Sequence, residues 1–400
     1  MKNKERLFWV ALNFKQVPAN RTLIMNSINK EYFDRKNQTL QNRYPIPPDK
    51  EPEWRFNFVS AELLNFLSEI PFVRHRSVFE NILVNARLNK AEQDYSSVLN
   101  NISLVNFSKE TENYIQNNPC IFCAWHFGSY RLINHFIAQK NIPYCLVISK
   151  QIVQSEGNDF LQRFSEKYPR NRDLQIVDAE SPNAGICILR LIKQGYSILF
   201  YIDGNTGTGL TRDNSNNCYI DFLAGKIFAR TGVAFLSHLS KTPILPIISY
   251  RKSIDQNVFH FHQLIFPEKQ KARIEYAQDC TQKLYNLLSI YVETNTDQWE
   301  AWLYLYKVMK SGDSKSEEAK VKLPIDHSTK QFIFNHRLFG VYRWENGFYL
   351  FNKKDFIAYP INRDIYGFFK GVSEGKLNTG RLDKDLFSQL YRKQVLIYAD

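Results

Sequence analysis

From residue 120 onward, short apolar runs alternate with amphipathic segments, and this alternation constrains the fold more than any other feature. The runs CIFCAW, YCLVIS, LQIVDA and SILFYID predict strands, and the segments between them carry apolar residues at the three- and four-residue spacings typical of helices. After a glycine-rich loop, KIFARTGVAFLSHLSK is expected to be helical, and ILPIISYRK is expected to be a strand. This order predicts an α/β fold with a mixed sheet flanked by helices.

Changes in composition divide the chain into three parts. Residues 1–310 form the predicted main domain, whose first part, 1–118, is expected to be mostly helical. Residues 311–322 are polar and charged and are expected to be a linker. Residues 323–400 carry short strand-like runs, two helical segments and a last apolar run, a pattern that predicts a small α+β winged module.

Composition and charge restrict the kinds of partner that the protein is expected to bind and the cell compartment in which it is expected to work. A net charge of +12 favours an acidic partner such as nucleic acid, an anionic membrane surface or a phosphate-bearing substrate. The 30 Phe and 22 Tyr are scattered and do not cluster with arginines, so nucleic-acid binding is not expected. The apolar runs are too short to span a bilayer. The six cysteines suit a reducing compartment, which predicts a cytoplasmic protein, with peripheral contact at the inner membrane as a further option.

Two local features leave alternatives open. The first residues, MKNKERLFWVALNFKQ, fit either an interfacial helix or an ordinary first helix packed on its own domain. Cys120 and Cys123 form a CxxC pair, but alternation along a strand points them to opposite faces, so we expect buried thiols.

His126 is the strongest candidate for a functional residue in this sequence. It follows a predicted strand and precedes Gly128 and a predicted helix, which is where open α/β sheets place their ligands. Gly128 would let the backbone approach a ligand closely, and the first amides of the new helix would be available to an anion. A buried, hydrogen-bonded core histidine is the alternative.

Several segments together resemble the lipid A late acyltransferases of the lysophospholipid acyltransferase superfamily. WHFGSYR is similar to the family's first motif, a histidine, Phe-Gly and an acidic residue five positions after the histidine. VRHRSVFENILVNA, GYSILFYID, FLAGKIFARTGVAFLSHLSKTPILPI and DQWEAWLYLYK resemble its other segments in the same order. The resemblance covers about residues 70–310.

The resemblance implies acyl transfer on a glycerolipid acyltransferase-like fold. His126 would be the general base that takes a proton from the acceptor while the acceptor attacks an acyl thioester. The donor would be acyl carrier protein or acyl-coenzyme A, with no bound cofactor, and the acceptor would be a lipid or a peptide. A non-catalytic protein that binds an acyl lipid or an acyl carrier is the alternative.

Arg131 stands where the family has its acidic residue. A guanidinium only donates hydrogen bonds, so it cannot accept the imidazole N–H. Loss of the orienting carboxylate in a His–acid pair costs on the order of 10⁴ in rate. Three explanations remain open: Asp203, at another strand end, replaces the acid; the acceptor is an amine and needs a weaker base; or catalysis has been lost.

The remaining candidates are basic side chains and one histidine pair. Arg131 is expected either to bind a phosphate or a carboxylate or to be a solvated charge on a helix face. Arg212, Lys226 and Arg230 are expected either to bind phosphopantetheine or an anionic headgroup or to be surface charges. His260 and His262 share one face of a predicted strand, but a third ligand at a recognisable spacing is missing, so no metal site is expected.

The tail extends beyond the region that resembles the acyltransferases. Its pattern resembles the small domains of ribosomal-peptide modification pathways that bind a leader peptide as an added strand, and this resemblance would imply a peptide amine as acceptor. A generic accessory module is the alternative.

Overall fold

The computed structural model describes residues 52–93, 100–168, 174–204, 217–253, 256–268, 270–309, 332–370 and 382–398. The N-terminal segment with its proposed interfacial helix, the linker at 311–322 and Arg212 lie outside the described residues. Among the described residues, no helix combines the length and the apolar character needed to cross a membrane.

The main body is an α/β fold built on a seven-stranded mixed sheet, as the alternation of the sequence predicts. The strand order is β1-β9-β8-β2-β5-β3-β4, and neighbouring strands run parallel except for the antiparallel pair β8 and β9. The strands are β1 (Ile102–Val105), β2 (Ile121–Ala124), β3 (Tyr144–Ile148), β4 (Gln175–Asp178), β5 (Ser197–Tyr201), β8 (Ile244–Ser253) and β9 (Gln256–Phe261).

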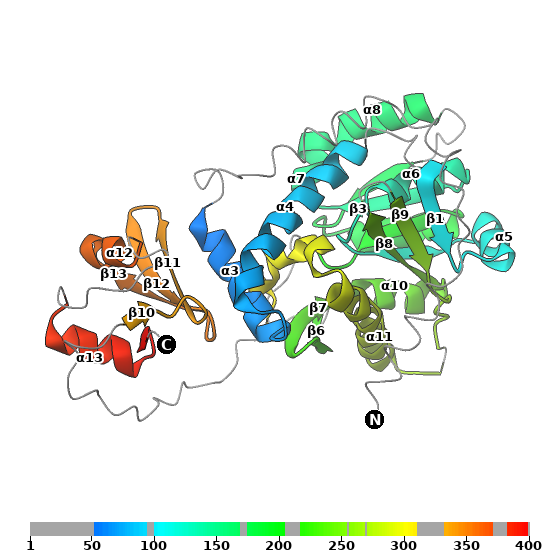
Figure 1. Cartoon of the computed structure of the whole chain (residues 1–400). Helices are drawn as coiled ribbons and strands as arrows, with labels where there is room; N and C mark the ends of the chain where they lie inside the picture. The colour runs from blue at the N-terminus through cyan, green and yellow to red at the C-terminus, as the bar shows by residue number, and fades with distance from the viewer. Residues whose placement is uncertain are drawn as a thin grey trace.

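Helices cover both faces of this sheet (Figure 1). One face packs against α5 (Lys109–Asn117), α6 (Leu132–Gln139) and α8 (Asn158–Lys167). The other packs against α3 (Glu53–Phe66), α4 (His75–Glu92), α9 (Ala184–Lys193), α10 (Gly232–Ser240) and α11 (Arg273–Thr294). The short helices are η2 (Phe72–Arg74), α7 (Lys150–Ile152), η4 (Val153–Gly157), η5 (Thr296–Gln298), η6 (Glu300–Leu303) and η7 (Leu305–Lys307).

The central strand β2 has hydrophobic cores on both faces, so its sequence is continuously apolar. Cys123 belongs to the core on the α4 side, whereas Cys120 belongs to the core on the α6 side. Both thiols are free and buried, as the alternation of side chains along a strand predicts.

Two local predictions were wrong. Residues 102–105 were expected to continue a helical region, but they form β1, the edge strand of the large sheet, which pairs with β9. The segment KIFARTGVAFLSHLSK, which starts at Lys226, was expected to be one helix, but Gly225–Arg230 forms β7, paired with β6 (Asn217–Phe222), and the helix begins only at Gly232. β1 pairs with a strand that is distant in the chain, whereas β7 forms a hairpin with the strand just before it, and in both cases strand pairing outweighs local propensity.

The C-terminal module contains the strands and helices that the tail predicts, plus one strand that it did not. Its elements are β10 (Phe332–Phe334), β11 (Phe339–Trp344), β12 (Gly347–Asn352), β13 (Ile357–Ile361), α12 (Arg363–Lys370), α13 (Lys384–Arg392) and β14 (Leu396–Tyr398). The unpredicted strand is β13, an edge strand that contains Pro360. Proline lacks the N–H that a ladder needs, which is why it is tolerated at a sheet edge.

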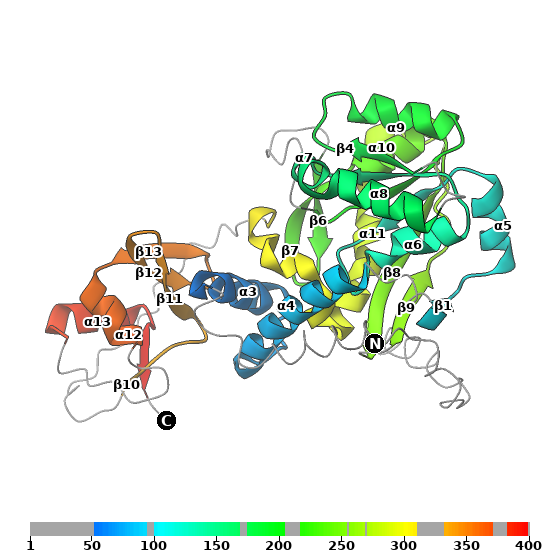
Figure 2. The same cartoon turned by 90° about the horizontal axis from the view of Figure 1, so that it is seen from above.

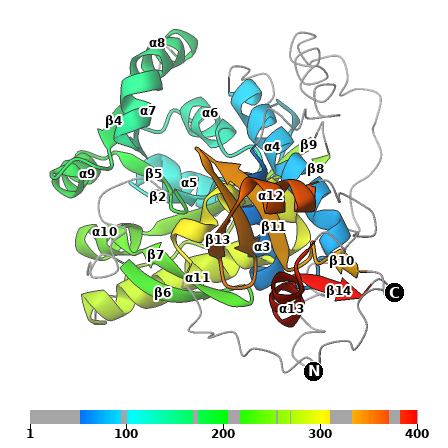
Figure 3. The same cartoon turned by 90° about the vertical axis from the view of Figure 1, so that its left-hand side faces the viewer.

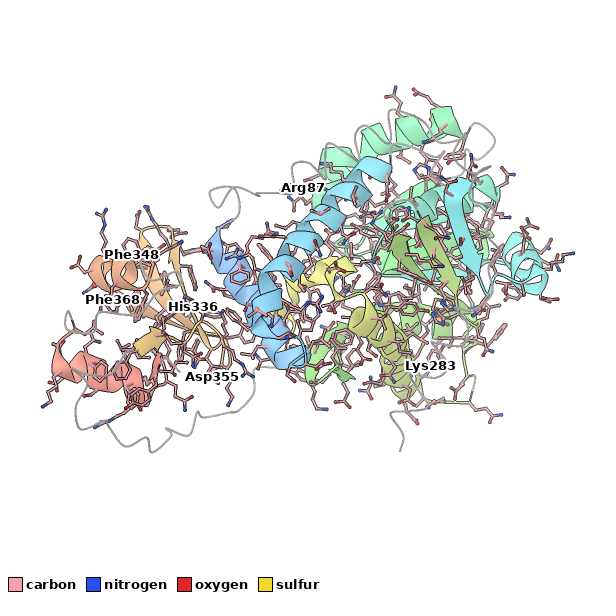
Figure 4. The ribbon with its side chains drawn as sticks, viewed as in Figure 1. Arg87, Lys283, His336, Phe348, Asp355 and Phe368 are labelled. Atoms are coloured by element: carbon pink, nitrogen blue, oxygen red, sulfur yellow. The ribbon has the colours of Figure 1, made fainter. Side chains whose placement is uncertain are left out.

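The module shares a hydrophobic layer with the main body. Figure 2 shows its sheet beside α3 and apart from the large sheet, and Figure 3 looks onto the module with α3 behind it. Phe58 of α3 stacks on Phe351 with ring centroids 4.7 Å apart, and Asn57 donates a hydrogen bond to the Val341 carbonyl. On its other face the sheet packs against α12, where Phe348 contacts Tyr366. Figure 4 labels Phe348, Phe368, His336 and Asp355 in this module, and Arg87 on α4.

Candidate functional site

His126 lies just beyond the carboxyl end of β2, in a turn that the neighbouring segments hold on both sides. The His126 carbonyl accepts a hydrogen bond of 2.9 Å from the Glu300 amide, and Phe127 forms a bridge with Trp299. The His126 side chain is 21% exposed and lines a cavity. Its Nε2 has no hydrogen-bond partner among the described residues, so this nitrogen is available to a ligand.

Asp203 is the partner of His126. It follows β5, which is the immediate neighbour of β2, and its side chain is only 2% exposed. The His126 Nδ1 lies 2.7 Å from Asp203 Oδ1, and the His126 amide donates to both carboxylate oxygens at 3.0 and 3.1 Å. Trp299 Nε1 donates to Oδ2 at 2.8 Å. An ionised carboxylate accepts the Nδ1 proton, which leaves the lone pair of the neutral imidazole on Nε2.

The charges around His126 raise its pKa above the usual value of a histidine. Burial lowers the pKa, but the charge and the hydrogen bond of Asp203 raise it, with a further contribution from Glu300. The guanidinium of Arg131 lowers it. The net effect favours the imidazolium that a general base becomes once it has accepted a proton.

The cavity has a volume of about 740 Å³ and lies over the carboxyl ends of β2, β3 and β5. Its walls come from these strands and from α7, α9, α10 and η6, and most of the strand and helix side chains are apolar. The apolar lining consists of Leu146, Val147, Ile148, Ile152, Ile188, Phe200, Ile202, Val233, Phe235 and Leu236. An elongated apolar ligand would therefore bury much of its surface beside His126.

Two of the basic candidates line this cavity. Arg131 is the N-cap residue of α6, and its Nη1 donates to Gln93 Oε1 at 2.7 Å. Arg230 ends β7, and burial lowers the pKa of its guanidinium, whereas Tyr285 and Glu180 raise it. The structure thus brings His126, Arg131 and Arg230 to the wall of one cavity, with Asp203 bound to His126.

Lys226 lies elsewhere. It belongs to the hairpin of β6 and β7, where its own side chain is exposed, forms an ion pair with Asp221, and does not line the cavity. Its placement fits the alternative of a surface charge.

Gly128 was expected to let the backbone approach a ligand closely, but its close neighbours belong to the protein itself. Its φ of 57° lies in the left-handed region, and a Cβ on this residue would lie 2.6 Å from the Ser249 carbonyl oxygen and 2.7 Å from Tyr250 Cα. The close approach is to β8 of the protein itself. The Gly128 amide donates to the Gln298 carbonyl at 3.0 Å, and the Arg131 amide donates to Asn89, so neither is available to an anion.

The segment after α11 contributes three site residues that the sequence did not reveal. Trp299 is buried in the core and donates to Asp203. Glu300 and Tyr304 line the cavity, and the Tyr130 hydroxyl donates to Glu300 Oε2 at 3.3 Å. The signal was available, because DQWEAWLYLYK is one of the segments of the acyltransferase resemblance.

A buried polar network stabilises the turn that follows His126. Arg251 and Glu92 form an ion pair with both side chains at most 5% exposed, and the Ser129 hydroxyl lies 2.8 Å from Glu92 Oε2. Arg251 also donates to Asn85 Oδ1 at 3.0 Å. The network ties the turn after His126 to α4 and β8, so Arg251 has a structural role.

The histidine pair of β9 belongs to a different network. His260 and His262 stack with ring centroids 4.7 Å apart, and both lie within hydrogen-bonding distance of the Tyr291 hydroxyl. Burial lowers the pKa of both rings, that of His262 to about 4. The described residues contain no group of three or more His, Cys, Asp or Glu side chains that could hold a metal ion.

Comparison with known proteins adds no assignment. No protein-family model matches the chain, and no curated protein matches its sequence.

Proposed function

We propose that this protein is an acyltransferase that moves a fatty acyl group from an acyl thioester to a nucleophilic acceptor. The observation that carries the proposal is the His126–Asp203 pair in the wall of a large, mainly apolar cavity. The pair supplies a base whose free nitrogen faces the cavity, and the cavity supplies room for an acyl chain. The resemblance of the sequence to lipid A late acyltransferases points the same way.

The reaction begins with His126 as general base. Its Nε2 accepts a proton from the acceptor as the acceptor attacks the carbonyl carbon of the thioester. The C–S bond of the tetrahedral intermediate then breaks, and the imidazolium gives its proton to the departing thiolate. Asp203 holds the ring in the required tautomer and balances its transient charge.

The negative charge that develops on the carbonyl oxygen needs donors. The turn amides of Gly128 and Arg131 are engaged within the protein, so side chains are the better candidates. The Arg131 guanidinium lines the cavity beside His126, and the Tyr304 hydroxyl lines it with no hydrogen-bond partner among the described residues. We assign oxyanion stabilisation to these two groups.

Asp203 offers an explanation for the arginine at position 131. The acid that the acyltransferase family carries five residues after the histidine would act on the same imidazole N–H that Asp203 accepts here. With this role filled from the neighbouring strand, position 131 is free to carry a cation. Of the three explanations open at the level of sequence, the geometry favours the replacement of the acid by Asp203.

The net charge of the chain supports the proposed donor and location. A net charge of +12 suits acyl carrier protein or coenzyme A, which are acidic, and it also suits peripheral contact with an anionic membrane from the cytoplasmic side. Arg230 is the described cation best placed to meet a phosphopantetheine phosphate at the cavity.

The acceptor is a lipid or a peptide. For a peptide acceptor, the C-terminal module provides an edge of β13 that pairs with no other strand among the described residues, although Pro360 removes one backbone donor from that strand.

A thiol-release assay tests the proposal. Dodecanoyl-coenzyme A and dodecanoyl acyl carrier protein are offered to the protein with a cell extract that contains lipids and peptides, and free thiol is followed with time. Release should exceed background for the wild type, vanish for His126→Ala and persist for Lys226→Ala, whose side chain lies outside the cavity. Thioester that is bound but never consumed would overturn the proposal in favour of a non-catalytic acyl-binding protein.

A further inference from the structure

Glu300 is an acidic side chain of the cavity that the acyl-transfer steps above do not use. It opens η6, and its amide donates to the His126 carbonyl, so its position relative to the base is fixed through the backbone. Its Oε2 accepts from the Tyr130 hydroxyl at 3.3 Å. Its Oε1 has no hydrogen-bond partner among the described residues and is not fully buried. This oxygen is therefore available to a ligand in the cavity.

The charge balance around His126 favours a cation. The charged groups that act on the imidazole are two carboxylates, Asp203 and Glu300, and one guanidinium, Arg131. When the imidazole is neutral, as a base must be before it reacts, these three groups sum to one negative charge. The hydrogen bonds of Asp203 to His126 and Trp299 occupy that carboxylate, so Glu300 carries the charge that a ligand can reach.

We propose that Glu300 binds the ammonium group of an amine acceptor, so that the product is an amide. This inference rests on the proposed acyltransferase function and names the acceptor class for the same site. A protonated amine would gain a charge-assisted hydrogen bond from the carboxylate, whereas a neutral hydroxyl would gain a weaker one. The Tyr130 side chain contacts both groups, with its ring centroid 4.8 Å from that of His126 and its hydroxyl 3.3 Å from Glu300 Oε2, so an amine held by Glu300 lies near His126 in the same cavity.

The proton balance suits this pair. The ammonium first gives one proton to His126 Nε2, and the freed lone pair forms the C–N bond with the thioester carbon. The C–S bond breaks, the thiolate takes the proton from the imidazolium, and the second proton of the nitrogen passes to solvent. Amide and free thiol are the products, and neither an oxidant nor a further reactant is needed.

Matched acceptors test the inference. Octylamine and octan-1-ol have the same chain, and at pH 7.5 the amine carries a positive charge. With dodecanoyl-coenzyme A as donor, we expect the amide to form with a kcat/KM at least ten times that of the ester. Comparable or faster ester formation that depends on His126 would overturn the amine inference and leave acyl transfer intact. Transfer to neither acceptor would overturn both.

Variants of Glu300 separate binding of the amine from support of the fold. Glu300→Gln should raise KM for octylamine about 10- to 100-fold, the range expected for a hydrogen bond to a charged group, with little change for octan-1-ol. Glu300→Asp should recover part of the loss. Equal losses with both acceptors, or none with octylamine, would contradict binding of an ammonium.

Discussion

The sharpest test of the His126–Asp203 pair is Asp203→Asn, because this change keeps the shape and removes the charge. Three N–H groups point at this carboxylate, from the His126 amide, His126 Nδ1 and Trp299 Nε1. An asparagine oxygen can satisfy Trp299 only if its NH₂ group faces His126. That NH₂ would donate to Nδ1, and the imidazole would then carry its proton on Nε2, where the lone pair of the base is needed.

The expected loss in kcat is about 10⁴-fold, the value known for the same substitution in a serine protease, and it corresponds to about 5.5 kcal/mol of transition-state stabilisation. The pH profile should change as well. Asp203 raises the pKa of His126, so its removal lowers that pKa, and the residual activity should reach its plateau at a lower pH.

Thiol release from dodecanoyl-coenzyme A between pH 5 and 9 measures both effects. Trp299→Phe is the graded control, because it removes one donor to Asp203 and keeps the carboxylate, so about a tenfold loss is expected. Thermal unfolding of both variants excludes a general loss of structure. Activity of Asp203→Asn within tenfold of the wild type, with an unchanged pH profile, would refute the reasoning.

Three further predictions address the cavity, its arginine and the module. Ile188→Trp fills part of the cavity from α9, so turnover should shift from dodecanoyl to shorter acyl donors, and equal preference for all lengths would contradict an acyl site there. Arg131→Glu, which restores the family pattern, should lower activity about 10- to 100-fold, since it removes an oxyanion donor while Asp203 already orients the base; a rise in kcat would contradict this. Lys353, 1% exposed beneath Phe72, has a pKa that burial lowers to about 7. Below pH 7 the folded protein therefore carries a buried charge on Lys353, which destabilises the fold, whereas near pH 10 the buried amine is neutral. The melting temperature of the wild type, measured relative to that of Lys353→Met, should therefore rise between pH 7 and pH 10. A constant difference would contradict a buried lysine of depressed pKa.

The sequence predicted the strands that end at His126 and Asp203, but it did not predict that they are neighbours. Each strand shows its own apolar pattern and its own polar end residue. Their adjacency depends on the sheet order, in which β5 pairs directly with β2 although β3 and β4 come between them in the chain. Asp203 was therefore one candidate among three explanations until the order was known.

Other features depend on contacts between distant segments, which a local pattern does not encode. Gly128 suggested a ligand because glycine permits close approach, but whether a ligand or β8 approaches is decided by packing. Glu300 gave no signal of its own, because its role depends on a bridge between Phe127 and Trp299 that brings η6 beside the base. The module could be predicted strand by strand, whereas its packing on α3 involves residues about 290 positions apart.

The central claim is that His126 catalyses acyl transfer in this cavity, and product analysis by mass spectrometry tests it most directly. The protein and His126→Ala are each incubated with a mixed pool of acyl thioesters and a cell extract that contains both lipids and peptides. The account predicts an acylated product that forms with the wild type and is absent with His126→Ala. A product that forms equally with both proteins, or none with either, would contradict it.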